Sequence, residues 1–256
     1  MDGAAAASAV SYTVSGILML NACRKNECFG FKLKTTHSDK AILKEYLRLG
    51  APVFGSSAVS CLGYVVFASL VSGMGTTVFA AHSIAVTAET IFYVPGYGLR
   101  SAASTLVGNA RGERSSHKLK ETGKLSIALT ISVMCVSGVV LYLGSTLLMS
   151  LFTHSERVIE LGSQMLKIVA FSEPFFGLMV VLEGIFYGLG RTKYAFFVES
   201  FGMWAVRILF TFLCVRVWGL ALSAVWYCMI ADNICKALMF AIPFMMKSKR
   251  EKLFKV

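Results

Sequence analysis

Forty consecutive residues, from Leu49 to Ala88, contain no Asp, Glu, Lys or Arg. A helix needs about 20 predominantly apolar residues to cross the hydrocarbon core of a bilayer. The run is therefore long enough for two crossings, and the glycine-containing "SGMGTT" at 72–77 predicts the turn between them. Only 15% of the whole chain is charged, against about 25% in an ordinary soluble domain. The sequence predicts an all-α integral membrane protein.

Similar apolar segments along the 256 residues predict about seven transmembrane helices. The expected helices cover 3–22, 42–71, 77–109, 125–152, 161–189, 194–215 and 219–246. The expected organisation is a first transmembrane helix in 1–23, a basic loop in 24–41, a six-helix bundle in 42–246 and a basic tail in 247–256.

The basic residues are distributed unequally between the two ends of these helices. Nineteen of the 25 Lys and Arg fall on one side, and three fall on the other. Because cytoplasmic loops are enriched in Lys and Arg, the basic side is predicted to be the cytoplasm, with the C-terminal tail there and the chain in the cell membrane. This distribution also accounts for the net charge of +11 without a nucleic-acid partner.

The polar residues do not form a recognisable catalytic or metal-binding set. The seven cysteines include no CxxC pair, and the four histidines are scattered. The sequence also lacks a P-loop and a Ser-His-Asp arrangement. The chain is predicted not to be an enzyme and to need no cofactor or metal.

Ionisable residues at membrane depth are rare and are functional candidates by default. Eight are found inside the predicted helices: Glu89, Arg100, Glu173, Glu183, Glu199, Arg207, Asp232 and Lys236. Five are acids and three are bases, which favours a cationic or amphipathic small molecule as a partner.

Glu89 is the strongest candidate for cation coupling. His82, Glu89 and Gly96 follow one another at intervals of seven residues and so lie along one stripe of a helix. Pro95 and Gly96 predict a bend in that helix. The alternative for Glu89 is a structural carboxylate bonded to a neighbouring helix.

Glu173, Glu183 and His82 are the other candidates for binding substrate or the coupling cation or proton. Pro174 follows Glu173, so the helix is expected to bend there and free backbone carbonyls. For the remaining charges a structural role is favoured. Asp232 and Lys236 are four residues apart and can pair on one helix face. Glu199, Arg207 and Arg100 are expected to pair with neighbouring helices.

The segment "AAHSIAVTAETIFYVPGYGLRSAASTLVGNARGE" (Ala80–Glu113) resembles the signature of the multidrug and toxic compound extrusion (MATE) family. The matching residues are Ala80, Ala81, His82, Ile84, Ala85, Glu89, Phe92, Pro95, Gly96, Gly98, Ala102, Leu106, Val107, Gly108 and Gly112. "LRLGAPVFGSS" at 47–57 and "SEPFFGLMVVLEGIFYGLGRTKY" at 172–194 resemble the family's seventh and tenth helices, and "MWAVRI" and "ADNICKA" resemble its last two.

The resemblance implies the C-terminal half of a twelve-helix antiporter, which exports drugs or metabolites in exchange for H⁺ or Na⁺. The helix in 1–23 would be the family's sixth and belong to an N-terminal lobe whose other helices are missing here. Asn109, Tyr187 and Arg191 depart from the family pattern. Ser60 stands where some members carry a carboxylate, so the coupling ion stays open between H⁺ and Na⁺.

Two alternatives to a MATE-type exporter remain open at this point. A lipid-linked glycan flippase has a similar helical architecture, but its cavity is expected to be lined by bases that bind pyrophosphate. The other alternative is an inactive truncated remnant or interaction subunit, because half a transporter has no opposing bundle.

Overall fold

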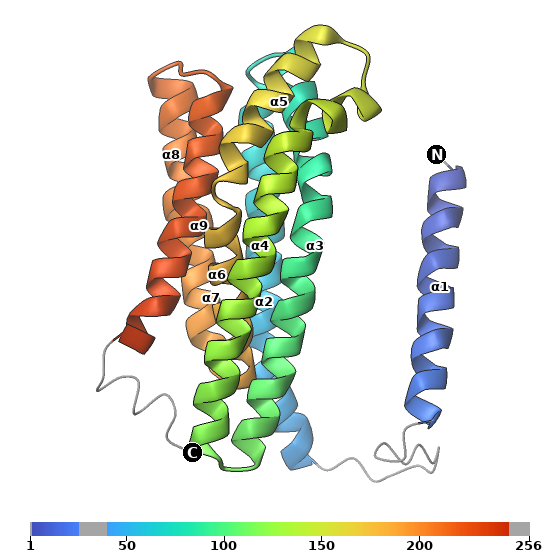
Figure 1. The fold of residues 1–256 in the computed structure, drawn as a ribbon, viewed down its shortest axis with the longest axis vertical. Coiled ribbons are helices and arrows are strands. Elements are labelled where there is room, and N and C mark those ends of the chain that lie inside the picture. The colour runs from blue at the N-terminus through green and yellow to red at the C-terminus, as the bar shows by residue number, and fades with distance from the viewer. Residues whose placement is uncertain (1, 26–39, 246–256) are drawn as a thin grey trace. The chain divides into compact units, whose positions relative to one another are not determined.

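The computed structural model describes residues 2–25 and 40–245, which form helices and no strand (Figure 1). The chain divides into two compact units, with the boundary between Lys44 and Glu45. In the first unit, α1 covers Asp2–Lys25, and Ala6–Arg24 within it is apolar enough to cross a membrane. Most of the predicted basic loop at 24–41 and the whole predicted tail at 247–256 lie outside the described residues.

The second unit is a helical bundle that begins within the first turns of α2. Its helices are α2 (Lys40–Ser72), α3 (Thr76–Gly112), α4 (Ser116–Phe152), α5 (Glu156–Ala170), α6 (Glu173–Gly188), α7 (Thr192–Phe201), η2 (Gly202–Ile208), α8 (Leu209–Phe212), η3 (Leu213–Val217) and α9 (Leu222–Met245). Over both units the described residues contain six spans long and apolar enough to cross a membrane, or seven when the bent pair α5–α6 counts as one. The predicted all-α class with about seven spans is confirmed.

The predicted start of the helix at 125–152 is wrong, because α4 begins at Ser116 and leaves only a short turn after α3. Ser115 is the N-cap of α4, and its hydroxyl accepts a hydrogen bond from the backbone N–H of Lys118 at 3.3 Å. Such a cap satisfies a donor that the first helical turn leaves free. The 37 residues of α4 extend over about 55 Å, so the helix projects beyond a hydrocarbon core of about 30 Å.

The predicted helix at 161–189 is two helices, α5 and α6, which meet at an angle of 57°. The break falls at Phe171 and Ser172, just before the expected position at Pro174. Pro174 lies in the first turn of α6, where the missing N–H of proline costs no intrahelical bond. The proline therefore starts a new helix instead of bending an existing one.

The predicted helix at 194–215 contains two π-helical stretches, η2 and η3, which sequence periodicity did not indicate. π-Helical insertions inside α-helices are rare and are often found at functional sites. Gly202 begins η2, and a Cβ there would lie 2.7 Å from Cγ of Lys236. The absence of a side chain at Gly202 lets η2 pack closely against α9.

The buried apolar side chains form two clusters along the bundle. One cluster includes Phe67, Ala88, Leu141 and Trp226 toward the end where α9 begins. The other cluster lies nearer the turns that join α3 to α4 and α6 to α7, at the lower end in Figure 1, and includes Ala103, Met134, Phe176, Ile185 and Phe240. Glu89 lies between the part of α3 that packs in one cluster and the part that packs in the other, and Asp232 lies between the corresponding parts of α9. Glu173 lies between α5, which contributes to the first cluster, and the rest of α6, which contributes to the second. The fold thus places a polar layer between two apolar cores.

Candidate functional site

A cavity of about 500 Å³ opens inside the second unit, between α2, α3, α6, the α7–η2 segment and α9. We call it the central cavity. Its charged lining residues are Glu89, Arg100, Glu183, Glu199, Arg207 and Lys236. Six of the eight ionisable residues expected at membrane depth are therefore brought to one space, from four segments far apart in the sequence.

Glu89 lies in the wall of the central cavity and is fully buried. The hydroxyl of Tyr93, one turn further along α3, donates a hydrogen bond to Oε1 of Glu89. Oε2 of Glu89 has no hydrogen-bond partner within the described part of the chain. The ring of Tyr93 stacks on Phe176 of α6 with 4.0 Å between centroids, which fixes the tyrosine beside the carboxylate.

Glu173, at the start of α6, is also fully buried but does not line the central cavity. Neither of its carboxylate oxygens has a hydrogen-bond partner in the described residues. Its side chain packs against α4 at Gly138, where an added Cβ would come within 3.2 Å of Cβ of Glu173. Glu173 is close enough to Glu89 for their charges to interact.

Glu183 is paired across the interface of α3 and α6. Arg100 Nη1 lies 2.8 Å from Oε2 of Glu183, and the hydroxyl of Tyr187 donates to Oε1 at 2.7 Å. The Arg100 guanidinium also lies over the ring of Tyr97, 5.0 Å from its centroid. Arg100 thus joins α3 to α6, which is the kind of contact expected for it.

The other bases form a network that connects η2 and α7 to α9. Arg207 Nε lies 2.9 Å from Oδ2 of Asp232, and Arg207 Nη2 donates to Oδ1 of Asn233 at 3.4 Å. Lys236 Nζ lies 3.0 Å from Oε2 of Glu199 and 3.3 Å from Oδ2 of Asp232. The two bases and two acids of this network neutralise one another within a buried region.

The ion pairs leave the charge of the site unbalanced. Each of the three bases, Arg100, Arg207 and Lys236, pairs with at least one acid. Among the ionisable residues described here, Glu89 and Glu173 form no ion pair. Since buried charges are costly unless they are paired, these two carboxylates are the groups most suited to bind a proton or a small cation.

His82 lies apart from the central cavity, although it shares the α3 stripe of Glu89. Its ring is packed edge-on between Phe67 and Trp226, with centroids 5.6 Å and 5.7 Å away. This position is in the apolar cluster that includes Phe67 and Trp226. The structure thus separates His82 from the carboxylates with which the sequence grouped it.

The Pro95–Gly96 pair lies inside α3, which is helical without a break from Thr76 to Gly112. Gly96 is buried, and a Cβ there would lie 3.3 Å from the ring of Phe176 and 3.4 Å from Sδ of Met134. The glycine therefore allows α3 to approach both α4 and α6 beside the site.

Several polar residues of the site were not predicted from the sequence. Tyr93 and Tyr187 each follow a glutamate by four residues and bond to it. That spacing places the two side chains on one helix face, so it could have indicated these pairs. Asn233 and the hydroxyl of Ser60 also line the central cavity. In the described residues no group of three or more His, Cys, Asp and Glu is placed to hold a metal ion.

Comparison with protein families matches residues 52–213 to the family described as MatE, which is more than half of the chain. The chain belongs to the MatE family. This MatE chain is 25% identical over 250 residues to "Probable multidrug resistance protein NorM" of Thermotoga maritima, covering 98% of the chain and 54% of that relative. It spans about half the length of the curated relatives it matches.

Solved structures agree with this MatE assignment at the level of the fold. A crystal structure of MATE in the straight conformation has a TM-score of 0.81 at 20% identity, covering 95% of the chain and 54% of that protein. An outward-facing multidrug resistance MATE transporter has a TM-score of 0.77 at 20% identity, covering 87% of the chain and 49% of that protein. The resemblance seen in the sequence is confirmed.

Proposed function

We propose that the chain is the C-terminal half of a cation-coupled antiporter, which exports drugs or cationic and amphipathic metabolites by alternating access. The observation that carries this proposal is the charge balance of the central cavity. Its bases form ion pairs with acids, whereas Glu89 and the nearby Glu173 form no ion pair with any base described here. The site therefore attracts positive charge.

Glu89 is the proposed coupling carboxylate. It faces the central cavity and keeps one oxygen free of hydrogen bonds to the described residues. A proton or Na⁺ and a cationic substrate would compete for this oxygen, so binding one would release the other. Tyr93 is the proposed positioning residue, because its hydrogen bond holds the carboxylate in place. Glu173 and Glu183 remain the secondary candidates.

Pro95 supplies a point at which α3 can deform during the cycle. Proline removes the hydrogen bond that the carbonyl of Ile91 would accept in a regular helix. Gly96 has no side chain to obstruct a change in packing against Phe176. We infer that ligand exchange at Glu89 changes the curvature of α3 just beyond it, which opens one side of the cavity and closes the other.

A second lobe is part of this proposal, because alternating access needs two bundles that move against each other. The chain spans about half the length of its curated relatives, which supports a requirement for an N-terminal lobe. The proposed location is the plasma membrane, with the C-terminus in the cytoplasm. The basic residues at 111–124, where α3 ends and α4 begins, would lie on this cytoplasmic side.

A lipid-linked glycan flippase is less well supported by the charges. Arg100, Arg207 and Lys236 do line the central cavity, as a pyrophosphate site would require. However, each of them is paired with a carboxylate, so binding pyrophosphate would require these pairs to break. An inactive remnant or interaction subunit stays an alternative that only transport measurements exclude.

The experiment joins this chain to the N-terminal half of the Thermotoga maritima relative and measures ethidium efflux from cells that lack their own exporters. We expect efflux above that of cells expressing either half alone. A well-expressed, membrane-inserted joined protein that exports no ethidium and no other cationic dye would contradict the proposal. In that event, export of a lipid-linked glycan would favour the flippase, and the absence of any transport would favour the remnant.

A further inference from the structure

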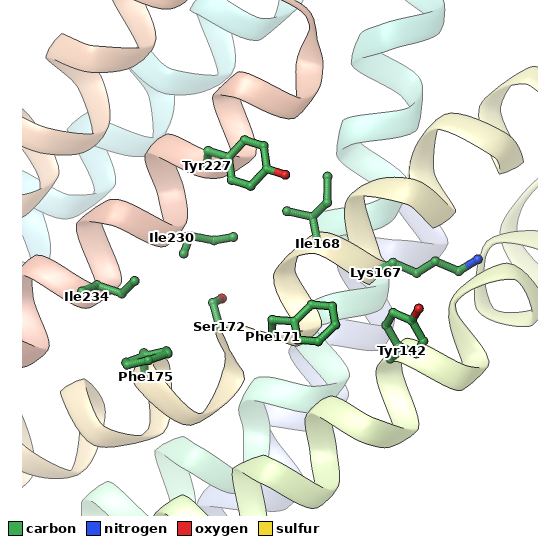
Figure 2. Close-up of a pocket in the computed structure, with 9 residues that line it drawn as sticks. All are labelled: Tyr142, Lys167, Ile168, Phe171, Ser172, Phe175, Tyr227, Ile230 and Ile234. Carbon is green, nitrogen blue, oxygen red and sulfur yellow. The ribbon is translucent and has the colours of Figure 1, made fainter.

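A second hollow, of about 480 Å³, lies on the outside of the bundle where α5 meets α6 (Figure 2). We call it the lateral groove. It is lined by Tyr142, Lys167, Ile168, Phe171, Ser172, Phe175, Tyr227, Ile230 and Ile234, none of which lines the central cavity. Phe171 is 73% exposed and Tyr227 58% exposed, so the groove is open to the surroundings of the bundle.

The lateral groove exists because the α5–α6 span is bent. The 57° bend at Phe171 and Ser172 moves α5 out of line with α6, which leaves a space beside α9. In Figure 2, Tyr227, Ile230 and Ile234 of α9 face the side chains around the bend across this space. The hydroxyl of Ser172 is engaged, since it donates to the carbonyl of Val169 at 2.9 Å. The walls are therefore almost entirely apolar.

One edge of the lateral groove is polar. Lys167 and Tyr142 lie together beyond Phe171, with the Tyr142 hydroxyl turned toward the lysine side chain (Figure 2). Lys167 is exposed and forms no ion pair with the residues that the structure describes. The Tyr142 ring meets Phe171 edge-on at 5.5 Å, which holds the tyrosine at this edge.

The positions of these residues along the helices give the groove a direction across the membrane. The first turns of α5 carry Glu156, Arg157 and Glu160, and Lys167 is the last charged residue before the buried Glu173. Lys167 lies inside the candidate α5–α6 span, and a lysine side chain can extend toward the polar interface while its stem packs on apolar surface. On α9, Ile234 lies seven residues beyond Tyr227, or about 10 Å deeper at 1.5 Å per residue. The groove runs from a basic edge formed by Lys167 and Tyr142 to an apolar end at Ile234.

We propose that the lateral groove binds a glycerophospholipid, with its phosphate beside Lys167 and Tyr142 and one acyl chain along Phe171, Phe175, Ile230 and Ile234. A basic side chain attracts a lipid phosphate, and an unbranched acyl chain matches an apolar groove on the outside of the bundle. A polar solute does not match these walls, because they offer it few hydrogen-bond partners. This binding is separate from transport through the central cavity.

The test uses the full chain reconstituted in liposomes that contain one of two photoactivatable lipids. The lipids are a phosphatidylglycerol and a diacylglycerol with the same diazirine-bearing acyl chain, so that only one carries a phosphate. We expect phosphatidylglycerol adducts, located by mass spectrometry, to concentrate at 167–175 and 227–234. Lys167→Gln should lower this labelling about five-fold and leave diacylglycerol labelling unchanged. The matched control Lys124→Gln, on α4 near the opposite end of the bundle, should change neither.

A second variant tests the apolar part of the groove. Ile230→Trp fills the space, so it should reduce labelling of 167–175 by both lipids while Lys167 is retained. Three results would each overturn the proposal. These are adducts spread evenly over the exposed helix faces, equal labelling by the two lipids in the unaltered chain, and crosslinks between two copies of the chain at Phe171 and Ile230 in place of lipid adducts.

Discussion

Arg207 lies inside the bundle with 6% of its surface exposed, and its guanidinium is held by Asp232 and Asn233 of α9. The sequence indicated that Arg207 and Asp232 would have structural partners, because isolated charges are costly in a membrane. It did not indicate which residues pair, since pairing depends on how η2 packs on α9. The pairing of Asp232 with Lys236 could be predicted from their spacing, because both residues lie on one helix. The contacts of Arg207 and Glu199 could not, because they join residues 25 or more positions apart.

Replacing Arg207 by methionine should destabilise the bundle by about 3–5 kcal/mol, because the Asp232 carboxylate would lose a close buried partner. The double variant Arg207→Met, Asp232→Leu should recover much of this loss, since it removes both charges. Unfolding of the purified chain by SDS in mixed micelles measures the free-energy differences. Arg157→Met removes an exposed pair with Glu160 and should cost less than about 1 kcal/mol. Equal losses for the Arg207 and Arg157 variants would contradict the assigned role of the buried pair.

At the scale of elements, α3 and α6 form the contact on which the site is built. Gly184 and Gly188 of α6 face the α3 backbone, and a Cβ on Gly184 would lie 2.5 Å from the carbonyl oxygen of Arg100. Small residues at such positions let membrane helices approach closely. The sequence identified the two helices and placed a bend near Pro174, but the complete break into α5 and α6 at Ser172 and the π-helical stretch of η2 could not be predicted. Both features depend on how the segments pack against one another, and hydrophobic periodicity carries no information about that packing.

Gly184→Ala should destabilise the bundle by about 1–3 kcal/mol, because the added methyl group forces α3 and α6 apart. Gly98→Ala is the matched control on α3, since a Cβ there meets no atom within 4 Å. That change should be neutral or stabilise the helix by up to about 1 kcal/mol. Thermal unfolding in detergent compares the two variants. A Gly184→Ala protein as stable as the Gly98→Ala protein would show that this interface is looser than described.

On the scale of the whole molecule, the turns of the second unit lie at two opposite ends of the bundle. The turn between α3 and α4 and the turn between α6 and α7 lie at the lower end in Figure 1, and the turn before α9 lies at the upper end. The sequence predicted the number of spans in this arrangement, because span count depends on composition and not on detailed packing. Composition and periodicity predict the helices of each unit, but they do not predict how the two units are arranged relative to each other.

The proposed topology predicts different accessibility for two histidine positions. His117 lies beside the α3–α4 turn, and His154 lies between α4 and α5. In a cysteine-free background, His154→Cys should react with a membrane-impermeant maleimide added to intact cells. His117→Cys should react only after the membrane is permeabilised. The reverse pattern would place the basic side of the bundle outside the cell and contradict the proposed orientation.

The central claim is that Glu89 couples a cation gradient to export, and gradient-driven transport in liposomes tests it most directly. The joined two-lobe protein is reconstituted, a proton or sodium gradient is imposed, and ethidium transport is recorded with and without the gradient. Glu89→Gln should lower the gradient-driven component at least about ten-fold, as expected from losing roughly 1.4 kcal/mol or more of coupling. Gradient-driven transport by the Glu89→Gln protein at the rate of the unaltered protein, with equal amounts reconstituted, would contradict the account.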